Sequence, residues 1–188
     1  HPRMQELLEF MDKQYGTFRA AADGIPAAHR ERQPAEGCWS VAQVVDHVAR
    51  VEGMFAGFMT RALAEARAQG LAAETETGTV LAPALLTRLA DRSVKRNAPE
   101  PAHPAPDARY EEALTALDEA HRRGRELLAG ADGLALETVR MPHPSLGMLN
   151  LYEWGVAVGG HEGRHTEQVR EIAATLSGAP AGAAAERV

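Results

Sequence analysis

Cysteine is almost absent from this chain, which contains Cys38 and no other. A single cysteine excludes an internal disulfide and is typical of proteins in a reducing cytoplasm. Aromatic residues make up only 5% of the sequence, too few for the stacking surfaces that bind single-stranded nucleic acid. The net charge of −6 also lacks the excess of positive charge that nucleic-acid-binding proteins carry. We therefore expect no nucleic-acid partner.

Long hydrophobic runs are also missing. No apolar stretch approaches the ~20 residues that a membrane-spanning helix requires. The sequence does not begin with the charged-then-apolar pattern of a secretory leader. Apolar residues still account for 45% of the chain, enough to form a core. We expect a globular cytoplasmic protein that has no membrane partner and acts on a small molecule.

Four segments have apolar residues at the three-and-four spacing of amphipathic helices, and each ends near a glycine. The first ends at Gly24, the second at Gly70, the third at Gly130 and the fourth at the SGAP stretch that begins at Ser177. The expected N-caps of the last three are Ser40, Asp107 and Asn150, and Gln43 and Glu153 complete capping boxes with the first and last of these. No segment alternates with period two for long enough to predict a sheet.

Four such helices predict an all-α four-helix bundle, formed by a single domain over residues 1–177. The connection between the second and third helices is too long for a hairpin, so these helices need not be antiparallel. Within it, LAPALLTRLADR predicts a short helix and NAPEPAHPAP a proline-stiffened strap. Residues 178–188 are rich in alanine and glycine and are expected to form a loosely held tail.

The fourth helix contains HEGRH, in which His161 and His165 lie four residues apart and therefore on one face. The same face carries Trp154, Val158 and Ile172, so both imidazoles replace apolar residues in the inward stripe. Burying two unpartnered imidazoles side by side is costly, and a shared metal removes that cost by using their neutral nitrogens as ligands. The spacing therefore favours a metal site.

HEGRH also fits the H-E-x-x-H pattern of zinc proteases, in which Glu162 would act as general base. Metzincins require a glycine and a third histidine where this chain has Gln168 and Glu171. Thermolysin-like enzymes take a glutamate about twenty residues further on, and the candidate here is Glu186 in the Ala/Gly-rich tail. The protease interpretation is therefore the less favoured one.

An upstream histidine can supply the third ligand instead. His47 lies at the edge of the valine stripe of the second helix, and a ligand on one helix of a bundle can meet an i,i+4 pair on another. Three histidines leave coordination positions open, as in catalytic zinc sites. His121, near the inward stripe of the third helix, is the reserve ligand.

Three stretches of the sequence resemble motifs of the DinB/YfiT-like superfamily, within its DinB_2 branch. They are WSVAQVVDHVARVE, MPHPSLGMLNLYEW and HEGRHTEQV, and the resemblance covers about nine-tenths of the chain. It implies an up-down-down-up bundle in which the long connection is the crossover. It also implies a metal held by His47, His161 and His165, and it makes a homodimer plausible.

The resemblance implies a metal-dependent enzyme, because some members resemble transferases that join a low-molecular-weight thiol to an electrophile and others resemble hydrolases. The metal would be a divalent transition metal, zinc or nickel, with a thiol as co-substrate of a transferase. The alternative is a non-enzymatic stress-response or binding protein on the same bundle. The candidate catalytic residues are Arg164, Glu162 and Glu52. Other candidates near the site are Tyr152, Gln168 and His143.

Overall fold

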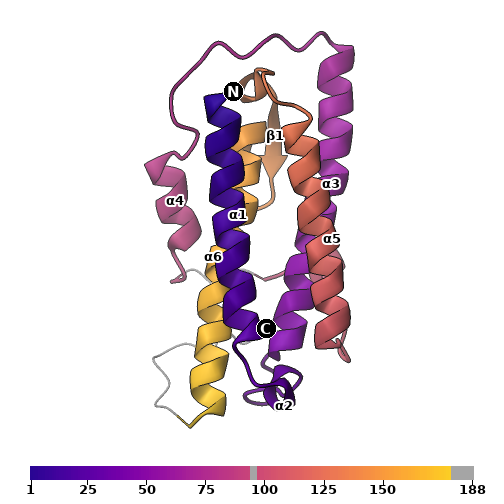
Figure 1. Cartoon of the computed structure of the whole chain (residues 1–188), viewed down its shortest axis with the longest axis vertical. Coiled ribbons are helices and arrows are strands. Elements are labelled where there is room, and N and C mark those ends of the chain that lie inside the picture. The colour runs from indigo at the N-terminus through magenta and orange to yellow at the C-terminus, as the bar shows by residue number, and fades with distance from the viewer. Residues whose placement is uncertain (94–96, 179–188) are drawn as a thin grey trace.

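The structure is a computed structural model that describes residues 1–93 and 97–178. Four long helices form where the apolar periodicity predicts them, and they pack side by side (Figure 1). Helices α1 and α6 run in one direction and α3 and α5 in the other, which confirms the up-down-down-up bundle. The expected tail falls, from residue 179 on, outside the described residues. The four helices are α1 (Pro2–Asp23), α3 (Val41–Ala68), α5 (Tyr110–Ala129) and α6 (Leu151–Leu176).

Two predicted capping boxes fix where α3 and α6 begin. The Ser40 hydroxyl accepts from the Gln43 amide at 3.2 Å, and the Gln43 side chain accepts from the Ser40 amide at 2.9 Å. Asn150 and Glu153 exchange the same pair of bonds at 2.9 and 2.8 Å. Both boxes satisfy amides that a helix start leaves without partners, so they set the register of the helices that carry the histidines.

The predicted cap of α5 is wrong. Asp107 does not cap the helix, which begins at Tyr110 after Arg109 without a side-chain cap from that residue. The Tyr110 amide instead donates to the Glu31 carboxylate at 3.4 Å, from the segment after the short helix α2 (Ala27–Arg30). A residue distant in sequence thus replaces the local cap.

The connection between α3 and α5 crosses the bundle from one end to the other, so the two helices are parallel (Figure 1). It contains the predicted short helix, α4 (Pro83–Ala90), which packs against α6. The strap that follows contains one 3₁₀ turn, η1 (Glu100–Ala102). Ala102 is fully buried, so this part of the strap is packed into the bundle.

A small antiparallel hairpin precedes α6 and was not predicted. Strand β1 (Arg140–His143) follows the 3₁₀ turn η2 (Leu136–Thr138) and pairs with β2 (Gly147–Asn150). Strands of four residues are too short for alternation to be recognised. Gly147 has a φ of 83°, a left-handed conformation that favours glycine at the turn.

A polar layer crosses the middle of the bundle between two apolar clusters. On α6, the apolar cluster near the hairpin includes Val158 and the cluster at the other end begins again at Val169. The buried polar residues between the clusters include His47, Glu52, His121, Glu162, His165 and Gln168.

None of the helices in the described ranges is long and apolar enough to cross a membrane.

Glycine at position 160 allows α4 to approach α6. A Cβ atom added to Gly160 would lie 2.7 Å from Leu89 Cδ1 and 3.0 Å from Leu89 Cβ. We expect Gly160→Ala to lower the free energy of unfolding by about 1–2 kcal/mol, because overpacking outweighs the gain in helix propensity. Urea denaturation would measure this change.

Gly53→Ala is the matched control, since Gly53 is an exposed residue within α3 and no heavy atom lies within 4 Å of its added Cβ. That variant should gain about 0.5–1 kcal/mol from helix propensity. Equal gains in both variants would show that the packing of α4 on α6 does not depend on Gly160.

Candidate metal centre

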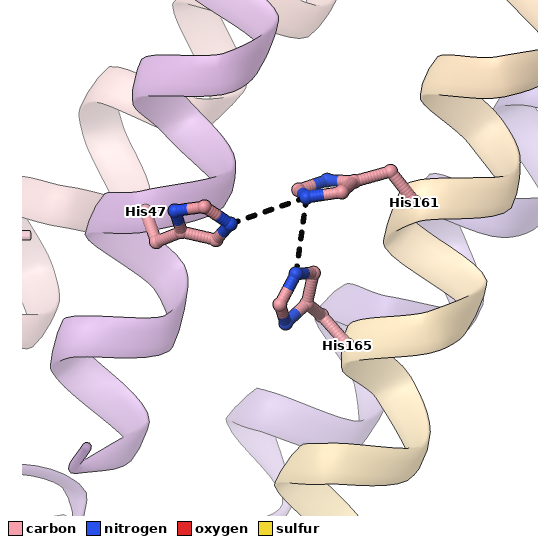
Figure 2. A group of neighbouring side chains, drawn as sticks. All are labelled: His47, His161 and His165. Atoms are coloured by element: carbon pink, nitrogen blue, oxygen red, sulfur yellow. Dashed lines mark hydrogen bonds between the residues drawn. The ribbon is translucent and has the colours of Figure 1, made fainter. Parts of the chain in front are cut away.

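Three histidines from two helices converge in the polar layer (Figure 2). His47 projects from α3, and His161 and His165 project from neighbouring turns of α6. The Nε2 atom of His161 lies 3.1 Å from that of His47 and 3.0 Å from that of His165. His47 and His165 are buried and His161 is half-buried. The structure thus brings together the three residues that the sequence analysis selected, and we call them the three-histidine cluster.

The outer nitrogens of two rings are fixed by hydrogen bonds. His47 Nδ1–H donates to the Ala102 carbonyl at 2.7 Å, and His165 Nδ1–H donates to the Gln168 side-chain oxygen at 2.6 Å. A neutral imidazole carries one proton, so both Nε2 atoms present lone pairs towards His161. The Nε2 atom of His161 carries at most one hydrogen when the ring is neutral, so it cannot satisfy both neighbours.

A divalent metal fits this arrangement. Zinc binds imidazole at about 2.0–2.1 Å, and tetrahedral geometry then places ligand nitrogens about 3.3–3.4 Å apart, close to the separations in this cluster. Ligating histidines commonly donate their other N–H to a carbonyl oxygen, as His47 and His165 do. The His161 Nδ1 atom is buried and has no hydrogen-bond partner among the described residues. The cluster therefore has the donor set, spacing and supporting contacts of a metal site.

Burial keeps the rings of His161 and His165 neutral at physiological pH. The pKa of His165 is lowered to about 3 by burial and by the neighbouring ring of His47. Burial and the two neighbouring histidines also lower the pKa of His161 well below its usual range. The neutral form is the one that coordinates metals.

The lowered pKa of His165 predicts how stability responds to pH in the metal-free protein. The unfolded chain binds this proton near pH 6.5 and the native state only near pH 3, so the unfolded state gains protons first as the pH falls. The stability of the chelator-treated protein should therefore decrease between about pH 6.5 and 3, by up to about 1.4 kcal/mol per pH unit for this residue. Urea denaturation at several pH values would measure the slope.

His165→Gln removes this titration and serves as the comparison. The slope of its free energy of unfolding against pH should be smaller than that of the wild type. The difference should be up to about 1.4 kcal/mol per pH unit, the contribution of one proton. Parallel slopes in the two proteins would contradict the neutral, buried state of His165.

Arg164 anchors the C-terminal end of α4 to α6. Its guanidinium is buried and donates to the Asp91 carbonyl at 2.7 Å, just after α4. Arg92 adds a two-bond ion pair with Glu171 of α6 at 2.8 and 2.7 Å. The charge of Arg164 contributes to lowering the pKa of His161. Arg164 is therefore close enough to the three-histidine cluster to act on it electrostatically, and its catalytic role remains a prediction.

Glu52 and Glu162, the other candidate catalytic residues, belong to a separate group with His121. The potential ligand atoms of these three residues all lie within 4.8 Å of one another. His121, the reserve ligand, thus joins two carboxylates and not the three-histidine cluster. A zinc protease would need Glu162 to act at the metal, and its assignment to this group disfavours that interpretation. Glu186, the other residue it required, lies outside the described residues.

The remaining sequence candidates divide between the site and the scaffold. Gln168 contacts the site directly through His165. Tyr152 does not, because its buried hydroxyl donates to Glu74 at 2.9 Å near the hairpin. His143 ends β1, its ring lies 4.7 Å from that of Trp154 at a tilt of 47°, and it contributes to lowering the pKa of His161. The sequence analysis did not identify the Ala102 carbonyl, because a main-chain acceptor leaves no signal in residue type.

Comparison with known proteins supports both the fold and the family. A crystal structure of TT2238, described as a four-helix bundle protein, superposes with a TM-score of 0.55. The two sequences are 23% identical over 89% of this chain and 98% of that one, a likeness that shows the fold. No curated protein matches the chain significantly. The family model described as the DinB superfamily matches residues 11–169. This chain, with its three converging histidines, belongs to the DinB superfamily.

Proposed function

We propose that this protein is a metal-dependent enzyme that transfers a low-molecular-weight thiol to an electrophilic small molecule. The observation that carries the proposal is the convergence of three imidazoles, in which the Nε2 atoms of His47 and His165 lie 3.1 and 3.0 Å from that of His161. His47, His161 and His165 would hold zinc or nickel, both of which imidazole suits. Three protein ligands leave positions open for a substrate.

The chemistry follows from the charges around the site. A metal on three imidazoles lowers the pKa of a thiol or water molecule that binds it, which provides a nucleophile at neutral pH. The hydrogen bonds from His47 to Ala102 and from His165 to Gln168 hold the rings in place before substrate binds. The guanidinium of Arg164, which is close enough to lower the pKa of His161, favours an anionic substrate.

Thiol transfer is favoured over hydrolysis by what surrounds the cluster. Metal-assisted hydrolysis commonly uses a carboxylate as general base next to the metal. Within the described ranges, the group of potential ligands at the three-histidine cluster contains no carboxylate, and Glu162 groups with Glu52 and His121. A thiol needs no separate base once its pKa is lowered.

A direct assay tests the transferase. Zinc- or nickel-loaded protein is incubated with monochlorobimane and, in turn, cysteine, glutathione and coenzyme A, and the loss of free thiol is followed. We expect at least one thiol to react faster than with free metal. The rate should fall to that of free metal in His165→Ala and stay unchanged in His29→Ala, which alters a histidine of α2.

Thiol loss no faster than with free metal for every thiol tested would overturn the transferase. Hydrolysis of ester or amide substrates in the same preparation would then support the hydrolase. Metal binding without either activity would support the alternative, a non-enzymatic binding protein.

A further inference from the structure

The second group of buried ionisable residues lies beside the proposed active centre and has no role in it. Glu52 projects from α3, His121 from α5 and Glu162 from α6, and their exposed fractions are 2%, 7% and 1%. The Nδ1 atom of His121 lies 3.5 Å from Glu52 Oε2 and 3.9 Å from Glu162 Oε1. We call these residues the Glu–His–Glu cluster. It joins three of the four long helices.

The atoms that face one another in this cluster have no hydrogen-bond partners. Among the described residues, this holds for Glu52 Oε1, for both oxygens of Glu162 and for His121 Nδ1. A buried polar atom without a partner typically costs about 1–3 kcal/mol, and a buried charge costs more. Such a set of neighbouring unsatisfied atoms is costly unless a bound cation or a shared proton completes their interactions.

The outer side of His121 indicates which species is bound. Its Nε2 atom lies 3.4 Å from Asp12 Oδ1, and its ring stacks on Tyr15 at 3.9 Å. Asp12 is held in turn by Arg125 Nε at 2.9 Å. When Nε2–H donates to Asp12, the Nδ1 lone pair of the neutral ring faces two carboxylates, a repulsive arrangement that a cation between them or a proton on Nδ1 would relieve. A carboxylate behind a ligating histidine is also a common support of metal sites.

We propose that Glu52, His121 and Glu162 form a second divalent-cation site, separate from the three-histidine cluster. All potential ligand atoms lie within 4.8 Å of one another, a span that one ion can bridge. Two carboxylates and one imidazole make a harder donor set than three imidazoles, so this site suits manganese better than the three-histidine cluster does. The cation would cross-link α3, α5 and α6 at the polar layer. This inference does not depend on the proposed activity.

A shared proton is the competing explanation. Burial and the neighbouring Glu52 carboxylate raise the pKa of Glu162 well above its usual range, so a proton between the two carboxylates could also reduce their repulsion. The two explanations differ in whether a metal binds. They also differ in the effect of replacing Glu52 with glutamine, which carries no charge and donates hydrogen bonds. This change should abolish the stabilisation by metal if a cation binds, and should have no such effect if the carboxylates share a proton.

Manganese binding to His165→Ala isolates the second site, because this variant disables the three-histidine cluster. Mn²⁺ titration followed by electron paramagnetic resonance should show one bound ion per chain. Adding Glu52→Gln should weaken binding more than the roughly 100-fold that loss of a supporting contact can cause. Adding Glu65→Gln, an exposed glutamate of the same helix, should leave it unchanged. Crystals soaked in Mn²⁺ should give an anomalous peak between the three side chains.

Thermal denaturation separates a lost site from a damaged fold. Without metal, Glu52→Gln should be at least as stable as its parent, since it removes a buried carboxylate. With Mn²⁺, the parent should gain several degrees in Tm and the Glu52→Gln protein none. No Mn²⁺ binding to His165→Ala, or equal binding with and without Glu52→Gln, would overturn the second site and favour the shared proton. Nickel binding to the wild type tests the first site independently.

Discussion

The His47→Ala variant should lose nickel binding almost completely. The Nε2 atoms of His47 and His165 lie 3.1 and 3.0 Å from that of His161, and His47 is the candidate ligand that α3 contributes. Removing the His47 side chain leaves two ligands, the i,i+4 pair on α6, and opens a cavity at the site. Supporting contacts around a metal commonly contribute 10–100-fold in affinity, so we expect losing a ligand to weaken binding by more than ~100-fold. Calorimetric titration with Ni²⁺ would measure the affinity.

Two further variants calibrate this result. His29→Ala removes a histidine of α2 outside the cluster and should bind nickel like the wild type. Gln168→Ala removes the acceptor of His165 Nδ1–H and should weaken binding by about 10–100-fold, between the other two variants. Unchanged affinity in His47→Ala would exclude a metal at this cluster, as would an equal loss in His29→Ala.

Glu74→Ala should cause the largest loss of stability. The Glu74 side chain is 2% exposed and accepts from Arg3 and from the Tyr152 hydroxyl, each at 2.9 Å. Burial alone would raise its pKa, but these bonds, the Glu76 amide and the charge of Arg3 together lower it. Alanine would leave the buried Arg3 guanidinium with the half-exposed Glu137 as its carboxylate partner and with the Tyr152 ring 4.7 Å away. We expect a loss of about 3 kcal/mol in the free energy of unfolding, measured by urea denaturation.

Glu76→Ala is the matched control for charge and location, since this exposed glutamate lies two residues along the same crossover. It should change the free energy of unfolding by less than about 0.5 kcal/mol, as surface substitutions usually do. A loss in Glu74→Ala no greater than in Glu76→Ala would show that Arg3 and Tyr152 find other partners without cost.

The bundle could be predicted because its determinants are local. The apolar spacing of α1, α3, α5 and α6 and the two capping boxes each depend on residues within a few positions of one another. The prediction was wrong where a distant residue replaced a local one, as Glu31 does at the start of α5. It missed the hairpin because four-residue strands are shorter than any pattern that periodicity can detect.

The site was predicted in part. The i,i+4 spacing of His161 and His165 put both on one face of one helix, a local fact. His47 was selected, with His121 in reserve, from its place on the second helix, and the resemblance of the sequence to a family supported that choice. The structure separates them, placing His47 against His161 and His121 against Glu52.

By itself, the sequence determined the four long helices, the starts of α3 and α6, the parallel course allowed by the long crossover and the pair of imidazoles on α6. These follow from backbone geometry over one or two turns. Only the tertiary structure decided that the strap gives the Ala102 carbonyl to His47 and that Glu162 turns to Glu52 and His121. Such contacts depend on how whole helices are rotated and offset against one another. Packing of the complete core sets that arrangement, and no short stretch of sequence encodes it.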